Sequence, residues 1–482
     1  MSATTHFIHP QNFPQQSSDF LAWLSTIPGV SINPKIILAD LRLQGAGRGV
    51  VAQADIQENE ELFTIPRDLV LSTRNSKLKA LLPQDLEDLG PWLSLMLVMV
   101  YEYLQGDSSS WAPYFKVLPQ GFDTLMFWSP SELQELQGSA VIEKIGRQSA
   151  DESILNIIAP VIRANPSLFP PIDGLASYDG DAGTQALLHL AHTMGSLIMA
   201  YAFDIEKPED EDDEGEGEDG YLTDEEEEQL PKGMVPLADL LNADADRNNA
   251  RLFQEENALV MKSIKPIAMG EEIFNDYGEI PRADLLRRYG YVTDNYAPYD
   301  VIEIPLETIC QAAGLPNADV ESQPALNFLE DLQIIDDGYV IPRPSQDESL
   351  EDILPVELVI LLKTLALTPD QLAHQTSKNK PPKPSFSDAE ASILSKAVQL
   401  RQMQYITTIS QDQEILAQLN TPDTLRDFER RCKMAVKVRL GEKEIFHRIA
   451  SMLNTYNNSS SSSKRNANGD GDESRKSKFQ RT

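Results

Sequence analysis

Two stretches decide how this chain folds: Pro236–Leu252 reads PLADLLNADADRNNARL, and Lys265–Val292 reads KPIAMGEEIFNDYGEIPRADLLRRYGYV. Each holds a short polar piece that turns the backbone, Asp239–Asn242 in the first and Phe274–Gly278 in the second. About three dozen residues separate these two pieces along the chain. Polar turns of this kind, set among apolar runs, are where binding and catalytic side chains are commonly placed. We therefore look for a functional site where the two pieces meet.

Strands are predicted around these stretches and helices between and after them. Alternation of apolar and polar residues in 251–262 predicts a hairpin, and short apolar runs with glycine in 36–72 predict three or four short strands. Apolar spacing near 3.6 predicts helices at 91–105, 140–165 and 184–203. After Val301–Ile304 the chain reads as helical to about residue 456. A strand-rich domain split by a helical insertion, then a separate helical domain, is the predicted order.

Composition restricts the partners of the chain more than its fold. Its 482 residues can hold two or three domains, and no apolar run reaches the length of a membrane span. The net charge is −34, from 41 basic and 75 acidic residues, so the surface repels phosphate backbones and attracts basic proteins. Two cysteines, Cys310 and Cys432, give no disulfide or metal framework and fit a reducing compartment. We expect a soluble intracellular protein, without a secretory signal, that binds a basic protein and neither nucleic acid nor membrane.

Asn242 and Tyr277 are the two side chains with the clearest chemical use. A buried asparagine must satisfy both amide donors and an acceptor, although DLLN by itself also fits a helix end or an Asx-turn. A tyrosine hydroxyl can orient an amine for an in-line displacement, although a lone Tyr277 also fits a strand residue with a satisfied hydroxyl.

The glycine run Gly45–Val50 reads GAGRGV and is open to two interpretations. A dinucleotide fingerprint requires glycine at position 50, which is valine, and a following helix, where the sequence predicts a strand. A tight turn between strands is the simpler interpretation. Glycine in such a turn also lets backbone groups come close to a ligand.

These motifs resemble those of the SET-domain protein methyltransferases. GEEIF before Tyr277 and DLLRRYGY after it are similar to the end of that domain. The resemblance implies an α+β protein: a SET fold of short strands with a long helical insertion, followed by an all-α C-terminal domain. It also implies transfer of a methyl group from S-adenosyl-L-methionine to a protein lysine, with no metal required.

The resemblance assigns roles to particular residues. Tyr277 corresponds to the catalytic tyrosine, and Asn242 to the asparagine that holds the cofactor. The cofactor would be bound by the set Ala46, Gly47, Arg48, Tyr201, Asn242, Ala243 and Tyr277, and the substrate lysine by Phe203, Asp239 and Tyr289. Many relatives carry Asn-His where this chain has Asn242-Ala243, so any role of an imidazole there is lost.

Two features resemble the Rubisco large-subunit methyltransferase group. No zinc-binding cysteines follow the tyrosine motif, and about 150 helical residues come after it instead. Within the group, LADLLNADAD and FNDYGEIPRADLLRRYGYV are most similar to the fungal ribosomal lysine N-methyltransferases of type 4. The resemblance therefore implies a basic large-subunit ribosomal protein as substrate, methylated by a monomeric enzyme.

The predicted domain boundaries follow from these patterns. We expect an N-terminal extension at 1–20 and a SET domain at 21–295, with its insertion at about 75–203 and a disordered acidic loop at 206–230. A helical substrate-binding domain is expected at 300–455, and a disordered serine-rich tail at 456–482. Basic residues in that tail, such as Lys464-Arg465, favour the nucleus over the cytoplasm.

Two rival interpretations stay open. A SET fold without turnover could serve as a binding protein or chaperone for basic ribosomal or histone clients, and Ala243 is the feature that favours it. His189 and His192, three residues apart on a predicted helix, could share a metal, but no third and fourth ligand is in sight.

Deleting residues 207–228 should slow association with a basic protein substrate at low salt and leave S-adenosylmethionine affinity unchanged. The segment is rich in carboxylates and poor in apolar residues, so it acts by long-range attraction and adds little to the core. Stopped-flow association rates of the two forms should converge as the Debye length falls to about 8–10 Å. Identical rates at every ionic strength would make the segment an inert spacer.

Overall fold

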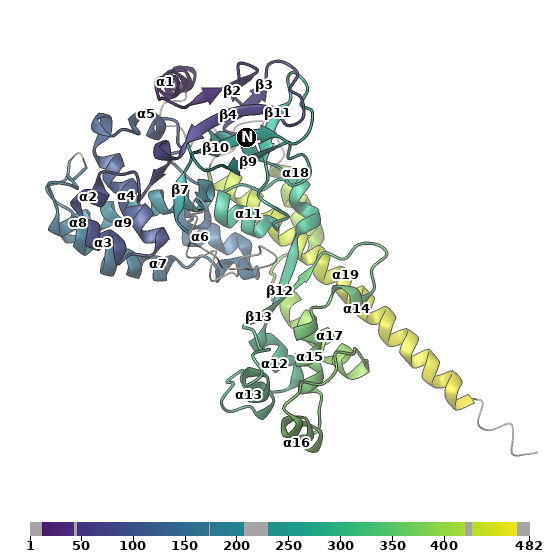
Figure 1. Cartoon of the computed structure of the whole chain (residues 1–482). Coiled ribbons are helices and arrows are strands. Elements are labelled where there is room, and N and C mark those ends of the chain that lie inside the picture. The colour runs from purple at the N-terminus through teal and green to yellow at the C-terminus, as the bar shows by residue number, and fades with distance from the viewer. Residues whose placement is uncertain (1–11, 43–45, 173, 207–229, 420–426, 470–482) are drawn as a thin grey trace, which may run out of the picture. The chain divides into compact units, whose positions relative to one another are not determined.

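The computed structural model describes residues 12–42, 46–172, 174–206, 230–419 and 427–469 (Figure 1). The chain divides into two compact units. The first comprises Met1–Trp128, Glu143–Ile280 and Asp284–Tyr291, and the second Ser129–Ile142, Pro281–Ala283 and Val292–Thr482. Most of the predicted acidic loop at 206–230 lies outside the described residues. Within the described ranges, no helix combines the length and hydropathy that crossing a bilayer requires.

Three small sheets form the strand-rich part of the first unit. Their orders are β1-β4-β10-β9, β2-β3-β11-β8 and β5-β7-β6. Within the described residues of this unit, the strands of these sheets pair antiparallel except β8 with β11, which pair parallel. The strands are β1 Ser31–Ile32, β2 Ile36–Asp40, β3 Arg48–Ala52, β4 Glu61–Pro66, β5 Leu71–Ser72, β6 Ala202–Asp204, β7 Lys232–Met234, β8 Asn242–Ala243, β9 Ala250–Gln254, β10 Ala258–Ser263 and β11 Glu272–Asn275.

The helical insertion lies between β5 and β6 in the sequence. α4 is buried on all sides from Ser94 to Glu102, as expected of a helix that is apolar around its whole circumference, and it packs against α9. The helices of the first unit are α1 Phe13–Ser25, α2 Leu78–Leu81, α3 Pro83–Glu87, α4 Pro91–Leu104, α5 Ala112–Phe115, α7 Arg147–Ser153, a π-helix at Ile154–Ile158, α8 Ala159–Ala164, α9 Gly180–Tyr201 and α11 Arg282–Tyr289, the last from Asp284 onward.

The second unit is mainly helical and also holds one two-stranded antiparallel sheet. β12 Val301–Pro305 pairs with β13 Gly338–Pro342. The helices are α6 Pro130–Leu133, α12 Leu306–Ala313, α13 Pro324–Glu330, α14 Leu350–Ile353, α15 Val356–Leu365, α16 Pro369–Lys378, α17 Asp388–Gln402, α18 Ile409–Leu419 and α19 Asp427–Gly469.

Helix α19 and helix α1 both differ from the boundaries predicted by the sequence. α19 continues to Gly469, so the serine-rich tail expected from 456 is helical over its first part. α1 begins at Phe13, inside the extension expected at 1–20. The serine-rich composition predicted disorder from 456, whereas the helix continues through the first part of that segment.

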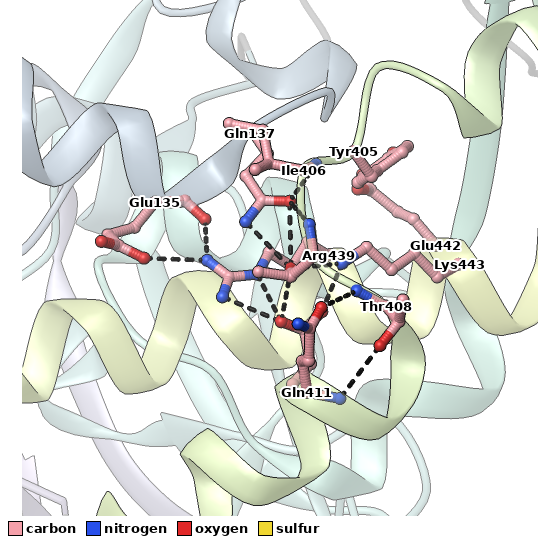
Figure 2. Close-up of polar contacts among 11 residues, drawn as sticks. Glu135, Gln137, Tyr405, Ile406, Thr408, Gln411, Arg439, Glu442 and Lys443 are labelled. Carbon is pink, nitrogen blue, oxygen red and sulfur yellow. Dashed lines mark hydrogen bonds and ion pairs between the residues drawn. The ribbon is translucent and has the colours of Figure 1, made fainter.

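A buried polar cluster joins the segment 129–142 to α18 and α19 within the second unit (Figure 2). Asp412 is fully buried and accepts hydrogen bonds from Arg439 Nε at 3.0 Å and from Thr407 Oγ1 at 2.7 Å. Arg439 also reaches Glu135 Oε2 at 3.0 Å. Buried charges of this kind are tolerated only when paired, so the cluster fixes how this segment of the insertion sits on α19.

Glu442 of α19 lies in the same region and is also buried. Its carboxylate accepts hydrogen bonds from Ser139 Oγ at 2.6 Å and from the Tyr405 hydroxyl at 2.9 Å. Burial raises the pKa of Glu442 to about 7, against the lowering effect of those two hydrogen bonds. The folded protein therefore holds a proton on Glu442 in a pH range where the unfolded chain has lost it.

Glu442→Gln should remove part of the pH dependence of stability. Because the folded pKa is raised, the wild-type contribution is complete below the unfolded pKa and is lost as pH rises through about 7. Wild type should lose roughly 1 kcal/mol per pH unit across the steep part of that window relative to the variant. Urea unfolding at pH 5, 6, 7 and 8 measures this, with Glu444→Gln on the same helix as the matched control. A wild-type-to-variant difference that is constant with pH would exclude this role.

Candidate active site

The parallel pairing of β8 and β11 brings the two polar pieces of sequence together. Phe274 lies opposite Asn242, and Asn275 lies opposite Ala243. The connecting loop is tied back onto β11 by the Asn249 side chain, which donates to Glu272 O at 3.0 Å and accepts from Phe274 N at 2.8 Å. Tyr277 follows β11 directly, so Asn242 and Tyr277 are held on adjacent segments.

Asn242 is held by Glu272, a residue of the GEEIF motif to which the sequence analysis gave no role. Its Nδ2 donates to Glu272 Oε1 at 2.6 Å, and burial raises the pKa of Glu272. A Cβ atom on Gly49 would lie 2.9 Å from Asn242 Nδ2, 3.0 Å from Glu272 Oε1 and 2.5 Å from Leu41 Cδ1. Glycine is therefore required at position 49 of β3 for the pair to keep its place.

Aromatic side chains gather around Tyr277. The rings of Tyr277 and Tyr289 stack with centroids 4.3 Å apart and 10° between their planes. Burial, and the nearby Tyr291, Tyr289 and Tyr201 phenols and Asp239, raise the pKa of the Tyr277 hydroxyl well above its usual value. Tyr201 lies close enough to Asp239 and Tyr289 for their charges to raise its pKa as well, after burial. Tyr277 therefore keeps its proton at neutral pH and can act as a hydrogen-bond donor.

Asp239 is the one acidic side chain in this tyrosine group. It is only 5% exposed, and its Oδ2 accepts a hydrogen bond from the buried Tyr114 hydroxyl. Its Oδ1 is buried and has no hydrogen-bond partner within the described residues. Burial raises the pKa of Asp239 to about 7, despite the opposing hydrogen bond from Tyr114. An unsatisfied buried carboxyl oxygen is a natural acceptor for a cationic or amine donor.

The backbone before Asp239 is strained. Leu237 is buried and has a φ of +77°, in a region that a leucine rarely adopts. Such a conformation persists only where the surrounding packing imposes it, and it occurs preferentially at functional sites. The position of Asp239 is therefore set by the core of the unit.

In the glycine-rich turn, part of the backbone that was expected to approach a cofactor is hydrogen-bonded within the turn. Ala46 N donates to Leu41 O at 3.1 Å, and Leu41 N donates to Gly47 O at 3.0 Å, so a ligand contact from Ala46 or Gly47 must use their other backbone groups. The Arg48 guanidinium is buried, donates to Val117 O at 2.6 Å and lies over the Phe13 ring. Burial lowers the pKa of Arg48 to about 10. Its side chain thus anchors α1, and only its backbone remains for a cofactor.

Phe203, Ala243 and the two histidines complete the predicted set. Phe203 lies in β6 opposite Gly233 and packs on the core; in the described part of the chain its ring does not stack on Tyr277 or Tyr289. Ala243 pairs with Asn275 through the backbone. His192 Nε2 lies 2.5 Å from Asp151 Oδ1, and His189 packs edge-on to Phe127. Within the described residues, no three His, Cys, Asp or Glu side chains lie together in a group that could hold a metal ion.

The structure adds Tyr114 and Glu272 to the candidate residues. Tyr114 is 125 residues from its partner Asp239 in sequence, and no local pattern announces that contact. Glu272 is the third residue of the quoted GEEIF motif, which the sequence analysis used only to support the family resemblance.

Comparison with known proteins decides what this arrangement is. A SET domain model matches residues 47–278, and a model described as Rubisco LSMT substrate-binding matches residues 319–446. The chain contains a SET domain followed by a region that matches the Rubisco LSMT substrate-binding family. S-adenosylmethionine is the methyl donor of SET-domain methyltransferases, and the buried Asn242–Glu272 pair with the close approach at Gly49 fits a tightly walled cofactor pocket.

Several curated proteins and solved structures are similar to this chain. The chain is 36% identical over 308 residues to ribosomal lysine N-methyltransferase 4 of Saccharomyces cerevisiae, a match that covers 62% of this chain and 60% of the relative. It is 29% identical to N-lysine methyltransferase setd6 of Xenopus laevis, over 92% of this chain and 96% of the relative. A solved structure of Rubisco LSMT bound to sinefungin and monomethyllysine shares the fold, with a TM-score of 0.65 at 21% identity over 91% of this chain and 92% of that chain.

Gly49→Ala should weaken S-adenosylmethionine binding strongly while the fold is retained. The added methyl group would collide with Asn242 and Glu272 and push the asparagine amide out of place. We expect a loss of affinity of at least about tenfold, the scale of one displaced hydrogen-bonding group in a buried site. Isothermal titration measures the affinity, and Gly90→Ala, whose Cβ would meet nothing within 4 Å, is the matched control. Equal affinities in the two variants would remove Gly49 from the pocket.

Proposed function

We propose that this protein methylates a lysine of a basic large-subunit ribosomal protein, using S-adenosylmethionine. The substrate class is supported by the yeast relative, whose name specifies ribosomal lysine methylation. It is also supported by the charge of −34, which favours encounter with a basic protein over encounter with nucleic acid. The observation that carries the proposal is the β8–β11 pairing, which places Asn242 opposite Phe274, three residues before Tyr277.

The tyrosine group supports a role as the lysine channel. A lysine side chain is cationic in water, and the faces of the stacked Tyr277 and Tyr289 rings can receive a cation. Desolvation in this group lowers the pKa of an amine, which favours the neutral nucleophile that methyl transfer requires. When bound, S-adenosylmethionine supplies an electrophilic methyl group.

Within this channel, Tyr277 and Asp239 have different chemical roles. The Tyr277 hydroxyl, still protonated at neutral pH, orients the amine. Asp239 Oδ1 offers a buried acceptor for an N–H of the incoming lysine, or for the proton that the ammonium loses, and Tyr114 holds the other carboxylate oxygen in place. A carboxyl with a pKa of about 7 exchanges its proton readily at cellular pH.

Asn242 and Ala243 favour an active enzyme over the rival interpretation, a binding protein or chaperone without turnover. Asn242 is pinned to Glu272, a contact that a pure binding protein has no reason to keep. Ala243 takes part in the sheet through its backbone, so the loss of a histidine side chain there leaves the β8–β11 pairing intact.

Partner docking and location belong to the same proposal. The second unit contains most of the residues that match the substrate-binding model, and it is the candidate surface for gripping a folded protein. The enzyme would act as a monomer in the nucleus, the cytoplasm or both, with the nucleus favoured by the basic C-terminal residues.

Tyr277→Phe should lower the turnover number about 10²–10³-fold, the typical cost of losing one positioned polar group in a catalytic site. The change removes one hydroxyl and little packing volume, so cofactor affinity and the unfolding midpoint should stay close to wild type. Methyl transfer to purified large-subunit proteins at saturating cofactor measures the effect. Tyr103→Phe, at a half-exposed tyrosine outside the site, is the matched control.

Wild-type turnover in Tyr277→Phe would remove this residue from the mechanism. The substrate class is tested separately by mass spectrometry of ribosomal proteins from a strain that lacks the gene. A single large-subunit lysine that loses its methylation supports the proposal, and unchanged methylation of every ribosomal protein contradicts it.

A further inference from the structure

The helical insertion of the first unit contains a cavity of about 450 Å³, a size typical of small-molecule pockets. Its wall is formed by α4, residues 124–126, α7 with the following π-helix, and α9. Most of the lining is apolar, including Trp92, Met96, Ile154 and Met199. One wall includes the start of the π-helix, a rare element that is found preferentially at functional sites.

Thr124 gives this cavity an unsatisfied polar point. The side chain is 2% exposed, and its Oγ1 has no hydrogen-bond partner within the described residues. A buried hydroxyl without a partner costs free energy, and native proteins rarely leave one unless a bound group completes it. Ser196 and His192, both buried, line the same cavity.

The polar end of the cavity is closed by a fixed pair. His192 is hydrogen-bonded to Asp151, and a neighbouring hollow of about 360 Å³ shares Met126 and His192 with the first. The second hollow is more polar, since Arg147, Asp151 and Gln185 line it. The apolar cavity therefore borders polar groups on one side.

The cavity faces away from the candidate catalytic tyrosines. Residues two apart on a helix of about 3.6 residues per turn point to opposite sides. Met199 lines the cavity and Tyr201 belongs to the tyrosine group, both on α9; Arg287 and Tyr289 have the same relation on α11. The cavity is thus a separate site. A group bound in it contacts α9 and α11 on the sides opposite to Tyr201 and Tyr289.

We propose that this cavity is a second binding site, for an uncharged ring or aliphatic group that carries a hydroxyl or similar hydrogen-bonding group. The apolar lining receives the body of the group, and Thr124 Oγ1 bonds its polar end. The group is either a free small molecule or a side chain of the protein substrate, and both present the same chemistry to the cavity.

The first experiment compares benzyl alcohol with toluene, which differ by one hydroxyl. Saturable binding to the full chain is followed by tryptophan fluorescence, since Trp92 lines the cavity, and Trp92→Phe should abolish the signal. Thr124→Val should weaken benzyl alcohol about threefold to tenfold, the value of one hydrogen bond, and leave toluene unchanged. An unchanged ratio of the two affinities in Thr124→Val would overturn the role of the hydroxyl.

Filling the cavity is the second experiment. Gly195→Leu and Ser196→Leu place bulk in the cavity from α9, and either should abolish binding of both probes. A Cβ on Gly195 meets only the flexible Met96 Cε within 4 Å, at 3.1 Å, so the first atom of the new side chain fits with a small shift of Met96. Thr193→Leu, on the same helix but outside the lining, is the matched control, and thermal melting verifies that each variant is folded. Absence of saturable binding in wild type, or equal binding in a folded filled variant, contradicts the site.

Competition separates the two sources of the group. If a saturating large-subunit protein substrate displaces benzyl alcohol, the natural occupant is a side chain of that substrate. If both bind together, the occupant is a free small molecule. Binding of the two probes requires no methyl transfer. The test of this cavity is therefore independent of the test of the proposed function.

Discussion

The short parallel pairing of β8 with β11 is the constraint on which the site depends. It is the one parallel strand pairing in the described part of the chain, and it sets Asn242 opposite Phe274, with Tyr277 three residues further on. The Asn249 side chain and the close approach at Gly49 hold the same two segments in register. If this register slipped by one residue, every side chain of the short strand would turn to the other face, and Asn242 would lose its contact with Glu272.

Burial then determines the chemistry of the site. The phenols around Tyr277 keep their protons because burial and mutual proximity raise their pKa values, while the same burial raises the pKa of Asp239 to about 7. In the proposed function, a group of neutral tyrosines with one readily protonated carboxyl would accept a lysine without trapping it as a permanent ion pair. The strained Leu237 and the Tyr114 hydrogen bond show that the core of the unit, more than the loop itself, fixes that carboxyl.

Local pattern was enough to predict much of this architecture. Alternation around residues 255–257 predicted the hairpin that the structure has as β9 and β10, and apolar spacing predicted α4 and α9. The SET fold, the lysine methyltransferase family and its cofactor are confirmed by comparison with known proteins. Contacts between distant residues were not predictable: nothing near Tyr114 indicates Asp239, and nothing in 129–142 indicates that this segment packs with α18 and α19. Such contacts are set by tertiary packing, which leaves no periodic trace in one sequence.

The central claim is that these residues together transfer a methyl group to lysine, and isotopic labelling tests it most directly. The purified protein is incubated with large-subunit ribosomal proteins and S-adenosylmethionine that carries a deuterated methyl group, and the products are mapped by mass spectrometry. The account predicts deuterated methyl groups on the Nε of one lysine in one basic protein, dependent on the enzyme. A folded enzyme that binds the cofactor by calorimetry yet labels no lysine in any of those proteins would contradict it.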